Sequence, residues 1–348
     1  MYNVSIWERE SFLAPQDVII IGSGFNGLWS AYYLKKKFPQ YAITVLERGA
    51  IPYGASTRNA GFSCFGSPSE LLQDAETMGA DNMWKLVEMR YKGLAEIGKQ
   101  FSNNVTEFDG SGGYECFTED SKDWDISIEK LDWLNAGMKN ITGDDQTFTL
   151  ADDKIVTFGF KGFAHLIENR FEGGVHSGRF AQHLLRTIQQ MGVQVLTGIN
   201  VERFEKSDKG VNVFSTEFQF TCKQLLLCTN AFTKDLIPEM DIIPNRGQVL
   251  VTEPIENLPF KGTFHFDQGY YYFRNLGNRL LLGGARNKAF DAENTTDINI
   301  TTLIQEELER FMQVHLLPGI SYTISDRWSG IMAMGSEKMP IVQQVDDH

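Results

Sequence analysis

Residues 17–27 of the chain read DVIIIGSGFNG, an apolar run followed by three glycines. A short apolar run fits either a strand or a buried helix, but the glycines after it favour a strand. Their spacing is G-x-G-x-x-G, in which the first glycine makes a tight turn, the second admits a pyrophosphate and the third allows close helix packing. A helical pattern follows and leads to the strand-like run AITVL at 42–46. Residues 17–47 are therefore predicted to form a βαβ unit that binds a dinucleotide.

An acidic residue at the end of the second predicted strand completes this pattern. Glu47 lies twenty residues after Gly27, at the place from which a carboxylate binds ribose hydroxyls. NAD and FAD sites share the fingerprint, so the choice between them depends on the next segment. The run GASTRNAG at 54–61 suits a tight loop that enters a helix beside a second phosphate or a flavin ring. No second glycine unit of this type follows, so we expect one dinucleotide, FAD, to carry the redox chemistry.

The composition limits the kinds of partner. A length of 348 residues predicts about two domains, and the net charge of −13 would repel a nucleic-acid backbone. Residues 1–12 lack a basic leader, and no segment has the length and apolarity needed to span a membrane. The four cysteines form no CxxC pair, and the six histidines lack metal-ligand spacing. We expect a cytoplasmic protein with reduced thiols, no metal site and no nucleic-acid partner.

Further patterns along the chain predict the fold class. Helices are expected over 69–101, 179–191 and 301–314, with loops around short strands over 103–125. Strands are expected at 193–196, 211–214 and 224–228, between 247 and 284, and within 327–342. The predicted fold is α/β, or α+β overall: a Rossmann-type FAD-binding domain with an inserted mixed β-sheet substrate domain. The FAD-binding domain is predicted to comprise 1–80, 155–240 and 322–348, and the substrate domain 81–154 and 241–321.

Over nearly its whole length the sequence resembles the D-amino-acid oxidase-like family of FAD-dependent oxidoreductases, which includes glycine, sarcosine and gamma-glutamylputrescine oxidoreductases. Within the family, the run SGIMAMG at 329–335 looks most like the gamma-glutamylputrescine branch. The other matching pieces are the glycine turn, Glu47-Arg48, 54–61, 200–202, 227–231, 270–273, 278–281, 327–330 and Met339-Pro340.

The resemblance implies a set of FAD-binding residues. Those around the pyrophosphate would be Gly22, Ser23, Gly24, Phe25, Asn26 and Gly27, with Glu47 at the adenosine ribose and Arg48 beside it. Those along the ribityl chain toward the isoalloxazine would be Ser56, Thr57, Arg58, Asn59, Ala60 and Gly61. Val201 would contact adenine through its backbone, or it is a buried strand valine. Thr229 and Asn230 would close over the phosphates, and Gly330, Ile331 and Met332 would border the ring.

Four departures from the family pattern refine this reading. Gly330 replaces the cysteine that tethers the flavin in sarcosine oxidase-like members, so we expect non-covalent FAD. Met332 replaces the arginine that holds a substrate carboxylate, which favours an amine over a free amino acid and leaves Arg274 or Arg286 as fallback anchors. Leu281 replaces the lysine linked to oxygen activation, so the electron acceptor is oxygen or another molecule. The sequence ends at His348, before the further strand, turn and helix of the family, which indicates a truncated record or a partly open flavin site.

The predicted activity is oxidation of a C–N bond in a small amine or amino acid. A hydride would pass to the flavin, giving an imine and then a carbonyl product. Tyr271 and Phe273 share one face of a strand by the period of two, and Tyr271, Trp328 and Met332 are the predicted catalytic residues in an amine pocket. The alternatives are a flavoprotein dehydrogenase acting on a C–O bond and a non-catalytic FAD-binding subunit.

Overall fold

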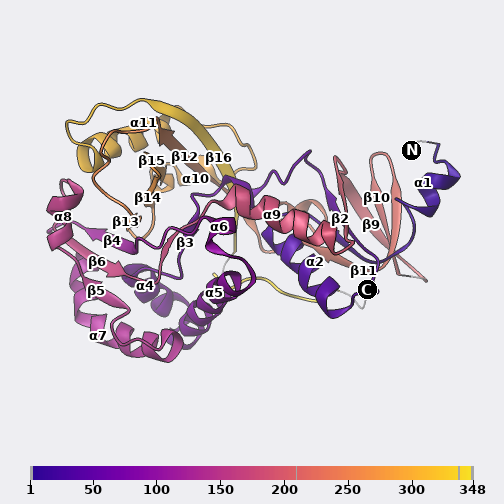
Figure 1. Ribbon diagram of the computed structural model, residues 1–348, viewed down its shortest axis with the longest axis horizontal. Coiled ribbons are helices and arrows are strands. Elements are labelled where there is room, and N and C mark those ends of the chain that lie inside the picture. The colour runs from indigo at the N-terminus through magenta and orange to yellow at the C-terminus, as the bar shows by residue number, and fades with distance from the viewer. Residues whose placement is uncertain (1–2, 209, 336–337, 346–348) are drawn as a thin grey trace.

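Two β-sheets organise the molecule, as seen in a computed structural model that describes residues 3–208, 210–335 and 338–345. The molecule is elongated, and the two sheets lie toward opposite ends of it (Figure 1). The first sheet has the strand order β8-β2-β1-β11-β10-β9, and the second has the order β16-β12-β15-β14-β13-β4-β6-β5. The chain crosses between them several times, which agrees with the predicted combination of a Rossmann-type unit and a mixed sheet.

The first sheet confirms the predicted βαβ unit. Strand β1 (Gln16–Ile21) pairs in parallel with β2 (Ile43–Glu47) and with β11 (Gln219–Leu227), and β2 pairs in parallel with β8 (Gln194–Thr197). The antiparallel strands β9 (Val201–Ser207) and β10 (Gly210–Ser215) complete it. Helices α2 (Phe25–Lys37) and α9 (Ser177–Gln190) pack side by side on one face (Figure 1), around Val18, Ile20, Leu28 and Leu184.

The second sheet is mixed, because β4 (Gly113–Phe117) and β13 (Thr263–Phe266) pair in parallel. Its other strands are β5 (Phe148–Leu150), β6 (His165–Asn169), β12 (Ile243–Thr252), β14 (Tyr271–Leu276), β15 (Arg279–Gly284) and β16 (Ile324–Met334). One face packs against α8 (Asp153–Phe158), α11 (Thr302–Phe311) and the π-helical turn η3 (Met312–Leu316), with Phe264, Phe273 and Phe311 in the core. The other face is directed toward the loops of the nucleotide-binding unit.

A helical group covers the part of the second sheet around β4 and β6. It comprises α4 (Pro68–Met78), α5 (Ala80–Gln100) and α7 (Lys122–Thr142), whose side chains share a core with Phe65 and Phe148. The helical prediction for 69–101 is confirmed, with a break at Gly79, whose φ of 83° ends one helix and begins the next. The shorter elements are α1 (Ile6–Glu10), α3 (Ala55–Arg58), β3 (Phe62–Ser63), α6 (Asn103–Thr106), β7 (Gly173–Gly174), η1 (Asn230–Asp235), η2 (Arg286–Lys288) and α10 (Phe290–Glu293).

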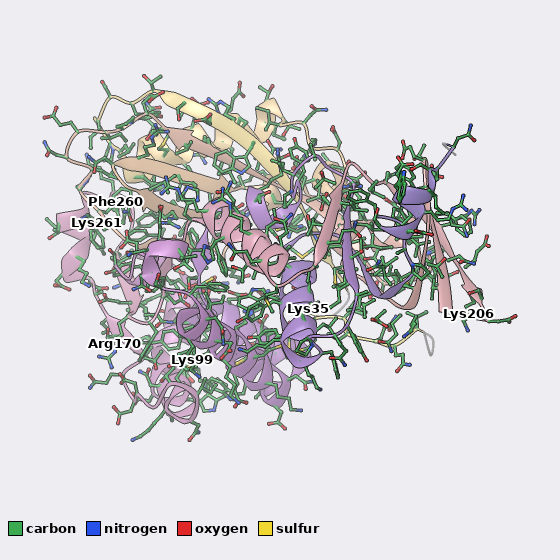
Figure 2. The ribbon with its side chains drawn as sticks, turned by 45° about the vertical axis from the view of Figure 1, so that its right-hand side comes forward. Lys35, Lys99, Arg170, Lys206, Phe260 and Lys261 are labelled. Carbon is green, nitrogen blue, oxygen red and sulfur yellow. The ribbon has the colours of Figure 1, made fainter. Side chains whose placement is uncertain are left out.

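Two strands from segments predicted for the FAD-binding domain pair within the second sheet. They are β6, within 155–240, and β16, within 322–348. The division into domains stays a prediction, since sheet membership alone does not define a domain, and its ends at 1–2 and 346–348 lie outside the described residues. Lys206 lies toward one end of the molecule and Lys261 toward the other (Figure 2). Among the described helices, none combines the length and apolarity of a membrane span.

Candidate active site

The glycine turn joins β1 to α2 in the geometry that its spacing predicts. Gly22 has a φ of 101°, which favours glycine. A Cβ on Gly27 would overlap the carbonyl oxygen of Gly22, so the third glycine is needed for the helix to approach the turn. Helix α2 begins after Gly24, which has no side chain with which to cap the helix. The first N–H groups of the helix, with its positive dipole end, therefore face the turn, where an anion is stabilised.

Glu47 lies at the carboxyl end of β2, beside the turn, with a relative exposure of 7%. Its Oε2 accepts hydrogen bonds from the N–H and the hydroxyl of Ser23, at 3.0 and 2.7 Å. Its Oε1 accepts a hydrogen bond from the N–H of Gly49 at 2.8 Å. The carboxylate is therefore fixed in position next to the glycine turn, as a ribose-binding acid must be.

The segment 54–61 forms α3 and returns to the glycine turn. The hydroxyl of Ser56 accepts a hydrogen bond from the N–H of Phe25, at 2.8 Å, in the first turn of α2. A Cβ on Gly24 would lie 3.1 Å from the same hydroxyl oxygen. Thr57 donates to the carbonyl of Pro52 at 2.7 Å, and Asn59 donates to the carbonyls of Ala55 and Ser56. The two loops thus form one cradle in which N–H groups and hydroxyls converge.

Strand β16 of the second sheet closes against α3. The indole N–H of Trp328 donates to the carbonyl of Arg58 at 3.0 Å, and the Arg58 side chain donates to the carbonyl of Ser329. A Cβ on Gly330 would lie 3.1 Å from the Cβ of Arg58. On the other side, Asn230 donates from its amide to the carbonyl of Ile331 at 3.1 Å. The structure therefore brings the predicted residues from α3, η1 and β16 to one place.

The face of the second sheet that meets α3 carries a continuous row of paired residues. From β4 to β16 the row runs through Glu115, His265, Tyr272, Gly283, Val249 and Trp328. The Tyr272 ring lies over Gly283, where a Cβ would overlap it. Its hydroxyl and the methyl group of Met332 both lie close to Gly247. Ala60, Tyr272 and Trp328 pack against the same small cluster of buried residues, so this row connects to the loop at 54–61.

Residues 17–348 of the chain match the model of a protein family described as FAD dependent oxidoreductase. The chain belongs to this family. FAD is therefore its cofactor, and the residues present fit that cofactor: the cradle at Gly24 offers N–H groups and hydroxyls to a pyrophosphate, and Glu47 offers a fixed carboxylate to a ribose.

The relatives of this FAD-dependent oxidoreductase include two bacterial proteins. The probable oxidoreductase OrdL of Haemophilus influenzae is 24% identical over 292 residues, which cover 77% of this chain and 64% of the relative. The gamma-glutamylputrescine oxidoreductase of Escherichia coli is 24% identical over 345 residues, which cover 95% of this chain and 76% of the relative. The chain thus spans less than two thirds of the first relative's length.

Solved structures with the same fold include two proteins that are named for activity on an amino acid. The glycine oxidase of Geobacillus kaustophilus superposes with a TM-score of 0.72 at 16% identity, covering 96% of this chain and 86% of that one. The L-proline dehydrogenase of P. horikoshii gives a TM-score of 0.73 at 16% identity, covering 95% and 85%. At this identity the likeness establishes the fold alone, and it agrees with the predicted α/β class.

The structure of this FAD-dependent oxidoreductase does not bring Tyr271 to Trp328 and Met332. Tyr271 and Phe273 do share a face, but that face packs on α11: the Tyr271 hydroxyl donates to Glu307 at 2.6 Å and its ring stacks on Phe311. Tyr272 takes the place predicted for Tyr271, because the neighbouring residue of a strand points to the opposite face. The sequence held the signal for Tyr272 in the three consecutive tyrosines at 270–272, but nothing local to choose among them.

The two fallback arginines of this oxidoreductase have different surroundings. Arg274 is buried and donates to the backbone carbonyls of Gly61, Val175 and Asn275, so its guanidinium fixes the end of the α3 loop. Arg286 donates to the side-chain oxygen of Asn245 at 2.7 Å and lies near the edge of the row, where its charge lowers the pKa of Tyr272 while burial raises that pKa to about 12. Arg286 is thus the fallback anchor closer to the row.

The remaining predicted cofactor residues of this oxidoreductase lie around the first sheet. The guanidinium of Arg48 lies 3.7 Å from the centre of the Phe232 ring, and Val201 begins β9 beside Ser215. The hydroxyl of Thr229 is 2.9 Å from that of Thr233 in η1. These contacts are compatible with either a cofactor role or a structural one, so the assignments stay predictions.

Two buried carboxylates hold the loop that follows Phe62. Glu172 accepts a hydrogen bond from the N–H of Phe65 at 2.9 Å, and Glu115 accepts from the N–H of Ser69 at 3.0 Å and from its hydroxyl. Burial raises the pKa of Glu172 to about 8 and that of Glu115 to about 7. No local pattern indicates these acids, because Glu172 lies between β6 and β7 and Glu115 lies on β4, both far from the loop in the chain.

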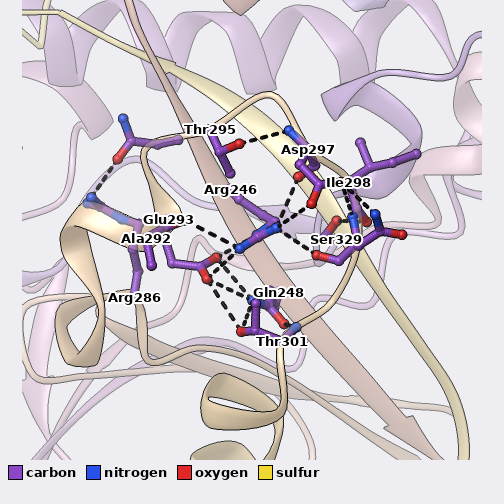
Figure 3. A network of polar contacts seen from close by, with 12 residues as sticks. Arg246, Gln248, Arg286, Ala292, Glu293, Thr295, Asp297, Ile298, Thr301 and Ser329 are labelled. Atoms are coloured by element: carbon purple, nitrogen blue, oxygen red, sulfur yellow. Dashed lines mark hydrogen bonds and ion pairs between the residues drawn. The ribbon is translucent and has the colours of Figure 1, made fainter.

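A buried ion pair lies on β12, which pairs with β16, the strand that carries Trp328 and Met332 (Figure 3). The guanidinium of Arg246 on β12 binds both oxygens of Glu293 at 2.9 Å, and Gln248 donates to the same carboxylate at 3.0 Å. The Ser329 hydroxyl donates to the carbonyl of Ile298 at 2.6 Å. The segment 292–301 is therefore held on β12 and β16, close to the point where these strands pair at Gly330.

Proposed function

We propose that this protein oxidises the C–N bond of a small amine, passing a hydride to FAD and releasing an imine that water converts to a carbonyl compound. One observation carries the proposal: the hydrogen bond between Trp328 and the carbonyl of Arg58, at 3.0 Å, joins the aromatic row of the second sheet to the dinucleotide cradle. This contact supports a substrate site between the two units, since a hydride donor must lie against the acceptor ring.

The chain's residues would divide the work between holding and orienting. When bound, FAD supplies the hydride acceptor. Ser23, Gly24 and Ser56 would hold its pyrophosphate and Glu47 its ribose, as their positions at the cradle support. Tyr272, Trp328 and Met332 would form the apolar wall that orients the substrate C–H bond and excludes water, which favours the uncharged amine needed for hydride loss. We therefore assign substrate positioning to Tyr272 in place of Tyr271.

Two features favour an amine over a free α-amino acid. The row residues from Glu115 to Trp328 include no arginine, and Met332 stands where the family carries the carboxylate anchor. The two fallback arginines are already engaged. Arg286 donates to Asn245, and Arg274 donates to three backbone carbonyls, which would lose their partner if Arg274 bound a carboxylate. The relatives and structural neighbours are named for activity on gamma-glutamylputrescine, glycine and L-proline, which supports chemistry at a C–N bond.

Anaerobic spectroscopy of the flavin tests the proposal. The purified protein is mixed with putrescine derivatives, alkylamines, sarcosine, glycine and D-amino acids, and bleaching of the flavin absorbance is followed. We expect alkylamines or putrescine derivatives to reduce the flavin faster than the amino acids do, and the Met332→Arg variant to lose part of this preference. Equal rates for glycine and the amines would contradict the amine preference. Reduction by none of them, with reduction by a polyol instead, would replace the C–N proposal by oxidation of a C–O bond.

We further propose that FAD is bound without a covalent link and that oxygen is a slow electron acceptor. The close approach of Gly330 to Arg58 leaves little space for a tethering side chain, and Leu281 offers an apolar side chain where the family has a lysine. Acid precipitation should leave the yellow colour in the supernatant, and stopped-flow mixing with oxygen should reoxidise the flavin more slowly than an artificial acceptor does. A cytoplasmic location is proposed from the free thiols and is tested by cell fractionation.

A further inference from the structure

A cluster of charged side chains adjoins the aromatic row on the far side of Phe62. It comprises Glu70 and Asp74 on α4, Arg90 on α5, His265 on β13 and Lys338 after β16. We propose that Glu70, Asp74 and His265 form an entry subsite where the substrate first binds as its ammonium ion, in exchange for the ammonium of Lys338. It then gives up a proton to solvent and reaches the flavin as the uncharged amine. The proposal rests on the proposed function, because it assigns the recognition of the amine.

The charges of this cluster match one alkylammonium ion. Lys338 forms ion pairs with both carboxylates, at 3.7 Å from Glu70. Arg90 lies 3.5 Å from the same Oε1 of Glu70 that Lys338 contacts. The two carboxylates and Arg90 together carry a net charge of −1, which the Lys338 ammonium balances. Since the lysine side chain is itself a primary alkylammonium, the cluster already holds the chemical group that we assign to it.

Asp74 makes this negative charge costly without a cation. Its side chain is 1% exposed, and apart from Lys338 it has no hydrogen-bond partner among the described residues. A buried carboxylate without donors needs a cation beside it or takes up a proton. The Lys338 side chain is 45% exposed, so it runs from solvent to the carboxylates. A substrate ammonium that displaced it would find the same path and the same charge.

His265 supplies an acceptor that no protein group uses. Both of its ring nitrogens are buried and lack a hydrogen-bond partner within the described part of the chain. Buried nitrogen atoms of this kind are rare and require an explanation. Burial lowers the pKa of His265, against the opposing charge of Glu70, so the ring is neutral and one nitrogen can accept an N–H. The other ionisable groups around the cluster include Glu115 on β4, Tyr272 on β14, Glu172 and Cys64.

The position of His265 connects the cluster to the proposed substrate site. Its ring centre lies 5.1 Å from that of Phe62, which lies 6.0 Å from that of Tyr272. Phe62 follows directly after Gly61, the last residue of the loop predicted to approach the flavin ring. The charge of Glu70 acts on His265, and aromatic rings such as those of Phe62 and Tyr272 attract an ammonium ion. The cluster is therefore suited to an amine and not to a neutral alcohol of equal shape.

Nuclear magnetic resonance of the flavin-loaded protein, labelled with ¹⁵N-histidine, tests this subsite. The probe is tert-butylammonium, which has no C–H bond next to nitrogen and cannot be oxidised. We expect it to shift the imidazole signal of His265, identified by its loss in His265→Gln, whereas neutral tert-butanol leaves that signal in place. Glu70→Gln should weaken probe binding about 10- to 100-fold, and Lys338→Met should tighten it about tenfold, because the competing ammonium is gone.

The opposite signs of these two effects separate binding from damage to the fold. An exposed ion pair on α5, Glu88 with Lys92, provides matched controls: Glu88→Gln and Lys92→Met should leave the affinity unchanged. An unmoved His265 signal in both the wild type and Lys338→Met would overturn the subsite, as would weaker binding in Lys338→Met.

The same variants distinguish the subsite from the proposed function. If oxidisable amines reduce the flavin and bind with equal affinity to the wild type, Glu70→Gln and Lys338→Met, the subsite is refuted and the proposed function stands. If tert-butylammonium shifts the His265 signal as expected but no amine reduces the flavin, the subsite stands and the proposed function is refuted.

Discussion

The substitution Glu47→Gln tests whether the carboxylate at the end of β2 binds the cofactor or only supports the turn. The carboxylate accepts three hydrogen bonds, from the N–H and hydroxyl of Ser23 and from the N–H of Gly49. A glutamine keeps one acceptor oxygen and turns an NH₂ group toward one of these donors. Hydrogen bonds to a charged acceptor contribute ~1.5–3 kcal/mol each, so we expect the free energy of unfolding to fall by ~1–3 kcal/mol.

The same substitution should weaken FAD binding separately, because the ribose hydroxyls would lose a charged acceptor. A loss of ~1.5–3 kcal/mol corresponds to an affinity about 10- to 100-fold lower. The assay is titration of the apoprotein with FAD, followed by quenching of the flavin fluorescence, alongside urea unfolding of the apoprotein. Glu205→Gln, at an exposed position on β9, is the control for the loss of one charge. A variant that loses stability but binds FAD as tightly as the wild type would refute the ribose assignment.

Three further predictions follow from individual contacts. Tyr271→Phe should lower the free energy of unfolding by ~1–3 kcal/mol through loss of the hydrogen bond to Glu307 and should leave amine-dependent flavin reduction unchanged. Tyr272→Ala should slow that reduction. The reverse pattern in stopped-flow measurements would return Tyr271 to the substrate site. Arg274→Met should cost ~3 kcal/mol in urea unfolding, since three carbonyls lose a buried donor, and a cost near zero would rule out its role in fixing Gly61. Burial raises the pKa of Glu172 from 4.5 to about 8, so between these pH values the folded state binds more protons than the unfolded state. The contribution of Glu172 to stability is therefore complete below about pH 4.5 and is lost as the pH rises through about 8. Glu172→Gln should flatten this decline in urea unfolding at pH 6 and 9, and parallel declines in the variant and the wild type would disprove the prediction.

The parts of the fold that were predictable from sequence have local signals. The glycine turn, Glu47 and the 54–61 loop are each encoded within a few residues, and the structure brings them together as the βαβ pattern implies. Helix α7 was not predicted, although its signals are present: the Ser121 hydroxyl accepts from the N–H of Trp124 at its start, and Gly143, with a φ of 82°, ends it.

The candidate substrate site could not be predicted in the same way, because it depends on the register of strands that are distant in sequence. Glu115, His265, Tyr272 and Trp328 form one row through pairings across six strands. A shift of one residue in any of these pairings would send its side chains to the opposite face. No pattern within a single strand contains this information, so the sequence supports the residue types but not their grouping.

Strand β14 illustrates why periodicity alone is insufficient. The period of two correctly assigns Tyr271 and Phe273 to one face and Tyr272 to the other, but both faces are apolar enough to be buried. What separates them is the surroundings: α11 covers the Tyr271 face with Phe311, whereas the α3 loop and Phe62 adjoin the Tyr272 face. Two glycines, Gly247 and Gly283, leave the space that the Tyr272 ring occupies. Glycines in neighbouring strands opposite an aromatic residue are thus the feature of the sequence that best indicates which tyrosine faces the site, once the pairing of the strands is known.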